Sequence, residues 1–285
     1  MTGATGALNG ATVEHLLKLV PADRIGVSVR DVAKAEHLAE RGVRVRRGSY
    51  EDPAALLDSF EGADQVLLVS SNDPGAEQTA LHRVGIDAAV AAGARRILYT
   101  SHQSVGLDSP FQPARVHAAT EQLLADSGVA WTSLRNGFYA HSLGWLLGPW
   151  RETGMITAPA DGPVSWTERA DEAEAAAVIL ASERPFDGPV TLTADAAVTF
   201  SEIAGTASEV TGREIRRVVV DDDTWVAEQV AHGTPEPMVR LLLPFFEAAR
   251  EGRFAAVDPI LGDLLGRKPR TVRQLLADRA AAFFW

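Results

Sequence analysis

A glycine-rich turn at the start of the chain, followed at once by an amphipathic helix, constrains the fold more than any other feature. Residues 3–10 read Gly-Ala-Thr-Gly-Ala-Leu-Asn-Gly, and apolar side chains then recur at positions 13, 16, 17 and 20. That spacing predicts a helix with one apolar stripe against a sheet. Glycines let an anion approach the backbone, and a helix N-terminus adds partial positive charge. The pattern is typical of a turn that binds the pyrophosphate of a dinucleotide; a turn between a frayed terminus and a surface helix is the alternative.

The place of this turn is unusual, because only Met1 and Thr2 precede it. Such a turn normally follows a buried parallel strand in the middle of the sheet. We therefore expect the first strand to be missing or truncated, and hypothesise that translation begins a few residues upstream. Asn9 stands where a third glycine is usual, with Gly10 one residue later, which predicts slightly altered packing of the helix on the sheet.

A cation follows the next predicted strand, at residues 24–29. Arg30 stands at the carboxyl end of that strand, where a dinucleotide-binding fold meets the adenosine ribose. An arginine there can pair with a 2′-phosphate and favours NADP(H), and Lys34, one helical turn further on, can reach the same phosphate. Asp31 is the alternative, because a shift of one residue would put a carboxylate in this place and favour NAD(H).

Predicted helices and strands alternate beyond Arg30, which is typical of a parallel sheet covered on both faces. We expect helices at 32–41, 53–60, 76–92 and 115–127, and strands at 43–46, 65–69, 96–100 and 129–134. The predicted fold is thus α/β, a Rossmann-type doubly wound parallel sheet. Ligands bind such sheets off the carboxyl ends of the strands. The polar residues expected at that edge are Arg30, Ser49, Ser70, Ser71, Thr100, Ser101, Arg135 and Asn136.

The second half predicts a smaller α+β lobe that binds the substrate, and we divide the chain into 1–134 and 135–285. Helices are expected at 168–181 and 200–210, and strands at 190–193 and 215–220. Aromatic rings that could stack on a flat substrate, or simply fill a core, follow the last strand of the first lobe. They are Phe138, Tyr139, Trp145, Trp150 and Trp166. The apolar segments 241–246 and 283–285 are expected to cover the core of the chain, with a homodimer contact as the alternative.

Composition excludes several classes of protein. The chain has 285 residues and no cysteine, so disulfides, zinc-thiolate sites and thiol catalysis are ruled out. A formal charge of −11 with only isolated arginine pairs argues against nucleic-acid binding. No signal peptide and no apolar run of membrane-spanning length is visible, which predicts a cytoplasmic protein that does not bind membranes. The histidines lack ligand spacing, so we predict no metal site.

Several short motifs occur in an order that resembles a known family. They are GATGxL at 3–8, Arg30, Gly-Ser-Tyr at 48–50, Tyr-Thr-Ser at 99–101, His-Ala-Ala-Thr-Glu at 117–121, Leu-Arg-Asn-Gly-Phe-Tyr at 134–139, Pro-Glu-Pro at 235–237 and Gly-Arg-Lys-Pro-Arg-Thr-Val-Arg at 266–273. Over nearly its whole length the chain resembles the NmrA-like atypical short-chain dehydrogenases, and within them it is most similar to the type-2 NAD(P)H:quinone oxidoreductases. That family includes regulators as well as enzymes.

The resemblance implies roles for individual residues. Contacts with the pyrophosphate would come from Gly3, Thr5, Gly6, Ala7 and Leu8. Arg30 and Lys34 would bind the 2′-phosphate, while Ser70 and Ser71 would line the path of the cofactor. His117, Asn136 and Tyr139 would lie near the nicotinamide and the acceptor. Ser49 stands where relatives often carry an acid.

The Tyr-x-x-x-Lys pair of ordinary short-chain dehydrogenases is absent. The tyrosines at 50, 99 and 139 are followed four residues later by Ala54, Gln103 and Leu143. Reduction of a ketone needs a positioned acid, whereas a quinone is more electrophilic and needs orientation more than acid catalysis. We therefore predict an NADPH-dependent oxidoreductase that transfers hydride directly to a quinone or similar small-molecule acceptor.

In that prediction His117 orients the cofactor ribose or the acceptor oxygen, and Tyr139 donates a hydrogen bond. A helix-surface histidine and a core aromatic are the respective alternatives. Phe138, Tyr139, Trp145 and Trp150 would contact the acceptor, and Thr100, Ser101 and Asn136 the cofactor. The alternative function is a non-catalytic regulator of the NmrA type that senses NADP(H).

Overall fold

The computed structural model describes residues 1–71 and 77–278. The apolar tail at 283–285, on which the homodimer alternative partly depends, lies outside the described residues.

Parallel strands form the centre of the first lobe. Four of them make one sheet in the order β3 (Gln65–Leu68), β4 (Arg96–His102), β5 (Ala130–Asn136) and β9 (Gly188–Leu192). Two more, β1 (Gly26–Val29) and β2 (Arg44–Arg47), form a separate parallel pair. The predicted Rossmann-type α/β class is confirmed by these parallel sheets.

The first two residues join the two sheets. Thr2 forms a parallel bridge with Ser28 of β1, and its backbone N–H donates to the carbonyl of Leu67 in β3 at 2.9 Å. The carbonyl of Met1 accepts from the N–H of Ser28 at 2.8 Å. The first strand, which we expected to be missing or truncated, is thus reduced to a single bridge that continues the hydrogen bonding from β1 to β3.

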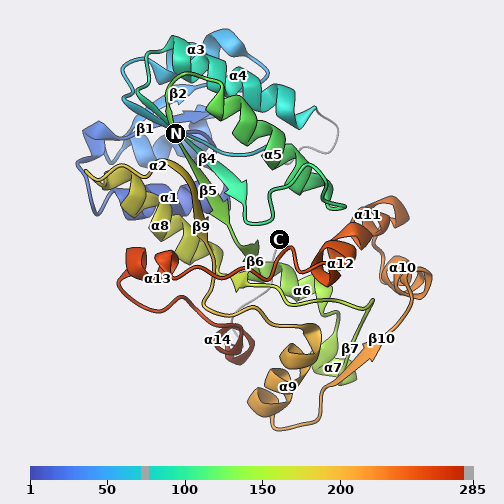
Figure 1. The fold of residues 1–285 in the computed structure, drawn as a ribbon. Coiled ribbons are helices and arrows are strands. Elements are labelled where there is room, and N and C mark those ends of the chain that lie inside the picture. The colour runs from blue at the N-terminus through green and yellow to red at the C-terminus, as the bar shows by residue number, and fades with distance from the viewer. Residues whose placement is uncertain (72–76, 279–285) are drawn as a thin grey trace.

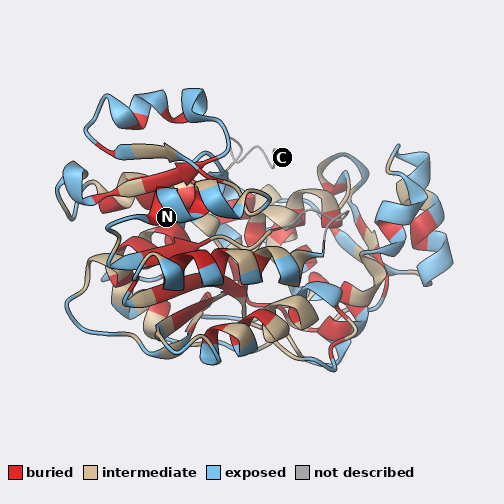
Figure 2. Ribbon diagram, turned by 90° about the horizontal axis from the view of Figure 1, so that it is seen from above, coloured by how far each residue is buried: buried red, intermediate tan, exposed pale blue. Residues whose placement is uncertain are grey.

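Helices cover both faces of the sheet (Figure 1). On one face α3 (Pro53–Phe60), α4 (Gln78–Ala91) and α5 (Gln112–Ala125) pack against one another. On the other face α1 (Ala7–Leu16) packs on α8 (Arg169–Ala181), which also contacts α13 (Ile260–Leu265). Buried side chains concentrate between these layers (Figure 2). The division at residue 134 assigns α8 and β9 to the second lobe, but the structure packs both on the first, because β9 pairs with β5.

Local capping explains where several helices begin. The carboxylate of Asp52 accepts from the N–H of Ala55, and Pro53 occupies the first turn of α3. The helix expected at 32–41 is instead a 3₁₀ turn at Val32–Ala35 followed by the single turn α2 (Glu36–Ala39). The carboxylate of Asp31 accepts from the N–H of Ala33 at 3.1 Å, and such a local hydrogen bond competes with regular α-helical pairing.

The second lobe surrounds a parallel pair, β7 (Met155–Ala158) and β10 (Arg216–Val219). The remaining elements are β6 (Phe138–Tyr139), α6 (Leu143–Leu146), α7 (Trp150–Thr153), β8 (Trp166–Thr167), α9 (Phe200–Thr211), α10 (Asp222–Ala231), α11 (Glu236–Arg240), α12 (Leu243–Arg250) and α14 (Val272–Ala277). Their core is rich in buried rings, among them Trp150, Trp166, Phe200, Trp225, Phe245, Phe246 and Phe254. Of the apolar segment 241–246, Phe245 and Phe246 are therefore core residues, while Leu241 is exposed.

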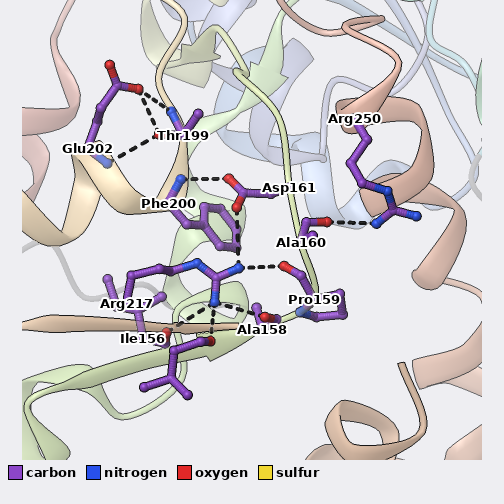
Figure 3. A network of polar contacts seen from close by, with 11 residues as sticks. Ile156, Ala158, Pro159, Ala160, Asp161, Thr199, Phe200, Glu202, Arg217 and Arg250 are labelled. Carbon is purple, nitrogen blue, oxygen red and sulfur yellow. Dashed lines mark hydrogen bonds and ion pairs between the residues drawn. The ribbon is translucent and has the colours of Figure 1, made fainter. Parts of the chain in front are cut away.

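A buried arginine ties this lobe together (Figure 3). The guanidinium of Arg217 donates to the carbonyl of Ala158 at 2.8 Å and to that of Pro159, and pairs with Asp161 at 3.3 Å. The second carboxylate oxygen of Asp161 accepts from the N–H of Phe200 at 2.7 Å, at the start of α9. One ion pair thus joins the segment after β7 to both β10 and α9.

Among the residues described, no helix combines the length and apolar character needed to cross a bilayer.

Candidate active site

A cavity of about 610 Å³ opens at the carboxyl ends of the strands of the first lobe. Its lining comes from the glycine turn, from the ends of β1, β3 and β4, and from both lobes at one end. The lining residues are Thr2, Gly3, Thr5, Gly6, Ala7, Leu8, Asn9, Ser28, Val29, Arg30, Lys34, Gly48, Ser49, Tyr50, Glu51, Leu56, Val69, Ser70, Ser71, Leu81, Thr100, Tyr139 and Arg169.

The glycine turn forms one wall of the cavity. Gly3 has φ +69°, and a Cβ there would lie 2.6 Å from Cγ1 of Val69, so that only glycine fits. Helix α1 then begins at Ala7 with no capping side chain and no acid in its first turn. Backbone N–H groups at that end of the helix are thus available to an anion.

Asn9 and Gly10 share the role of the usual third glycine. The Asn9 side chain is buried, and its Nδ2 donates to the carbonyl of Thr2 at 2.8 Å. A Cβ on Gly10 would lie 3.0 Å from the carbonyl oxygen of Ala4, so the glycine one residue later permits the close approach. The altered packing that the sequence predicts here is a hydrogen bond from Asn9 to the Met1–Thr2 segment.

Two cations line the end of the cavity next to β1. Arg30 and Lys34 are both exposed, and neither forms an ion pair with any described residue. The carboxylate of Asp31 caps the following turn and does not line the cavity. The register therefore places Arg30, not Asp31, on the wall of the cavity.

Hydroxyl groups line the opposite end. Thr100 accepts from the N–H of Ser70 at 2.8 Å and donates to the Ser70 hydroxyl at 3.3 Å. Tyr139 accepts a long hydrogen bond of 3.5 Å from Nδ2 of Asn136. Burial, together with the nearby carboxyl of Glu172, raises the pKa of Tyr139. Its phenol therefore stays protonated and can donate into the cavity.

A buried histidine supports the strand end that carries Ser71. The backbone N–H of Ser71 donates to Nε2 of His82 at 2.8 Å, so the neutral ring carries its proton on Nδ1. That Nδ1 lies 2.8 Å from the Thr120 hydroxyl, which itself donates to the carbonyl of Val116. Burial lowers the pKa of His82 to about 4, which keeps the ring neutral.

The same network extends to His117 through Tyr99. The Tyr99 hydroxyl lies 2.8 Å from Nδ1 of His117 and 3.4 Å from Nδ1 of His82. Burial lowers the pKa of His117 well below its usual value, with the neighbouring rings of His102 and His82 contributing. Burial thus favours the neutral form of His117.

Comparison with known proteins identifies the family. The NmrA-like family matches residues 1–266. The chain belongs to this family. Quinone oxidoreductase 2 of Escherichia coli is 35% identical over 276 residues, which are 96% of either chain.

Two solved structures are similar over almost the full length. The NADPH-dependent quinone oxidoreductase of Escherichia coli, complexed with NADPH, has a TM-score of 0.88 and 32% identity and covers 97% of both chains. The triphenylmethane reductase of Citrobacter sp., complexed with NADP(H), has a TM-score of 0.88 and 31% identity and covers 98% of both chains.

Within this NmrA-like chain the structure brings most of the predicted cofactor residues to one cavity. Those that line it are Gly3, Thr5, Gly6, Ala7, Leu8, Arg30, Lys34, Ser70, Ser71 and Thr100, together with Tyr139. Their separate roles toward a cofactor stay predictions.

Other predicted site residues lie behind the cavity wall or in the second-lobe core. The Ser101 hydroxyl donates to Glu121 at 2.8 Å, and Asn136 and His117 make the contacts given above. Trp150 is 3% exposed and belongs to the second-lobe core, against which Trp145 packs. The ring of Phe138 lies 4.8 Å from that of Phe245. Their predicted contacts with an acceptor also stay predictions.

Sequence reasoning missed three cavity residues that bear on function. The Tyr50 hydroxyl bonds to Thr2 and to the carbonyl of Val69, and it stands in the Gly-Ser-Tyr motif that could have indicated it. Asn9 was assigned only a packing effect. Arg169 carries no signal, because a charged residue at the start of a helix is common on protein surfaces.

Proposed function

We propose that the protein is an NADPH-dependent oxidoreductase that transfers hydride to a quinone or a similarly electron-poor acceptor. One observation carries the proposal. A single cavity is lined by an uncapped helix N-terminus, by two cations that pair with no acid among the described residues, and by a neutral phenol. Membership of the NmrA-like family, and relatives that are named quinone oxidoreductase and triphenylmethane reductase, support it.

The lining suits a phosphorylated dinucleotide. The turn at Gly3 packs so closely on Val69 that no Cβ fits, and Oδ1 of Asn9 is buried without a hydrogen-bond partner in the described structure. Arg30 and Lys34 would hold the 2′-phosphate, and the turn with the start of α1 would hold the pyrophosphate. Ser70, Thr100 and Tyr139 would surround the nicotinamide. When bound, NADPH supplies the hydride.

The residues at the Tyr139 end orient the acceptor. Hydride adds two electrons and one hydrogen to the quinone, and one proton must follow to give the hydroquinone. The protonated phenol of Tyr139 donates a hydrogen bond to the oxygen on which charge develops. The quinol oxyanion is a weak base, so orientation and this hydrogen bond suffice without a Tyr-x-x-x-Lys pair. In this proposal His117 is a neutral group, next to the Tyr99 hydroxyl, that positions its neighbours.

The test mixes purified protein with NADPH and a benzoquinone and follows the loss of reduced-nicotinamide absorbance. A rate clearly above that without enzyme is expected. Binding of NADPH without oxidation across several acceptors would contradict the proposal and favour the NADP(H)-sensing regulator. The cytoplasmic location, the homodimer and the absence of nucleic-acid binding stay predictions.

A further inference from the structure

We propose that Arg169 is an anion-binding residue of the cavity, which takes a phosphate, carboxylate or sulfonate group at the end next to Tyr139. The inference rests on the proposed function, because it treats the cavity as the place where cofactor and acceptor meet. It adds a second cationic site, at the opposite end from Arg30 and Lys34, that neither the motifs nor the predicted roles contain.

Arg169 lines the cavity, and no acid among the described residues pairs with its guanidinium. The side chain is half-buried, yet it forms no ion pair or hydrogen bond with any part of the chain that the structure describes. A guanidinium has five N–H donors, and leaving them without partners in a partly desolvated place is unfavourable unless a ligand accepts them.

The acids that surround Arg169 in sequence are engaged elsewhere. Glu168 pairs with Arg270 at 3.6 Å. Asp171 pairs with Arg267 at 2.9 Å and accepts from the backbone N–H of Arg270 at 2.7 Å. None of these carboxylates is available to balance the charge of Arg169.

Glu172, one turn further along α8, is also not a counter-ion. Its side chain is 1% exposed, and neither carboxyl oxygen has a hydrogen-bond partner in the described structure. Burial, with the charge of Glu168 adding to it, raises the pKa of Glu172 well above its usual value. The ionised form of Glu172 is therefore disfavoured, which leaves the positive charge of Arg169 poorly compensated.

The neighbours of Arg169 on the cavity side are neutral. The ring of His141 stacks on that of Tyr139 with centroids 5.4 Å apart. Burial lowers the pKa of His141 to about 4, and the charge of Arg169 contributes. Glu51 is the one acid among the described lining residues, and it stands beside Ser49, at the end where the sheet carries Arg30. An anion at the Tyr139 end would thus meet a guanidinium and a phenol O–H, and no carboxylate.

The start of helix α8 adds to the positive potential at this end of the cavity. Arg169 is the first residue of a 13-residue helix that no side chain caps. A helix N-terminus carries partial positive charge, which favours an anion within its first turn. The guanidinium fork can bind two oxygens of one phosphate or carboxylate in parallel.

Two ligands could present that anion. Helix α8 packs on α1, whose N-terminus faces the pyrophosphate position, so the diphosphate of the cofactor is one source. An acidic substituent on the acceptor is the other. Both would present anionic oxygens to the same guanidinium. The two sources can be separated by experiment, because NADP⁺ can be titrated in the absence of any acceptor.

The test compares Arg169→Gln and Arg169→Lys with the unmodified protein. Calorimetric titration with NADP⁺ alone measures the first source. Steady-state KM values for benzoquinone and for a naphthoquinone that carries a sulfonate measure the second. Arg184→Gln, a loss of the same charge just beyond the other end of α8, is the matched control. Thermal unfolding and circular dichroism confirm that each variant is folded.

We expect Arg169→Gln to weaken the binding of one of these ligands by roughly ten- to 100-fold, which is the loss of affinity typical of a charged hydrogen bond. Arg169→Lys should restore part of it, because it keeps the charge without the fork. A weaker NADP⁺ affinity assigns the anion to the diphosphate. A raised KM for the sulfonated quinone alone assigns it to the acceptor.

Two other results separate this inference from the proposed function. If the protein oxidises NADPH and Arg169→Gln changes neither the NADP⁺ affinity nor the ratio of the two KM values, Arg169 is not an anion site and the proposed function stands. If no acceptor is reduced but Arg169→Gln still weakens NADP⁺, the anion site is supported and the proposed oxidoreductase function is overturned.

Discussion

Two regions of the molecule use arginine in opposite ways. In the second lobe the Arg217 side chain is 7% exposed. Its guanidinium donates to backbone carbonyls and forms an ion pair with Asp161. In the cavity of the first lobe Arg30 and Arg169 have no such partners among the described residues. An arginine whose guanidinium donates to the chain stabilises the fold. An arginine that lines a cavity without such hydrogen bonds can bind a ligand instead. Variants in the two regions should therefore separate loss of stability from loss of binding.

The largest expected effect lies in the second lobe. Asp161→Ala would leave the charge of Arg217 buried without its carboxylate, which typically costs about 3–5 kcal/mol. Urea unfolding should show this loss, while any protein that remains folded binds NADPH as before. Glu209→Ala removes an exposed partner of Arg273 and is the control, with a change within about 0.5 kcal/mol. A loss below about 1 kcal/mol for Asp161→Ala would break the comparison.

Gly3→Ala tests the cavity wall. The positive φ should cost about 1–2 kcal/mol, and the close approach to Val69 about 1–3 kcal/mol more. Gly93→Ala is the matched control, because Gly93 has φ +80° with no atom near the added Cβ and should show only the first cost. Gly3→Ala alone should also abolish NADPH binding in calorimetry. Equal affinity in the two variants would mean that the turn does not hold the pyrophosphate.

Arg30→Ala sharpens the assignment of the cofactor. The substitution should weaken the binding of NADPH by about 1.5–3 kcal/mol, because a charge-assisted contact with the 2′-phosphate is lost. NADH lacks that phosphate and should be affected far less. Fluorescence titration with both coenzymes measures the difference. Equal losses would refute a 2′-phosphate at Arg30.

The smallest expected effect concerns His82, which lies beneath the cavity and is 2% exposed. Its pKa is about 4 in the folded protein and 6.5 as the ordinary value. As pH falls from 6.5 toward 4 the unfolded chain binds a proton that the folded chain does not, so stability falls through this window. At pH 5.5 His82 alone should contribute about 1 kcal/mol to this loss. Urea unfolding at pH 7.5 and 5.5 should show a smaller loss for His82→Gln, and an identical loss would falsify the assignment.

Much of the first lobe could be predicted because its signals are local. The glycine turn, the apolar stripe of α1 and the order of strands and helices each depend on residues close in sequence, and the structure confirms the α/β class that they indicate. The helix expected at 32–41 is wrong over its first turn, which is a 3₁₀ turn where the carboxylate of Asp31 accepts a hydrogen bond from the N–H of Ala33. The division at residue 134 did not anticipate that α8 and β9 return to the first sheet, because strand pairing over such a separation leaves no local pattern.

The sequence by itself determined that a dinucleotide-type turn opens the chain and that Arg30 follows the next strand, since periodicity and turn chemistry act between near neighbours. Only the tertiary structure decided that Arg30 and not Asp31 reaches the cavity, that His82 holds Ser71, and that Trp150 belongs to a core. It alone placed Arg169 in the same cavity as the glycine turn. Such contacts join residues far apart in the chain, and their geometry exists only after the helices and strands have packed.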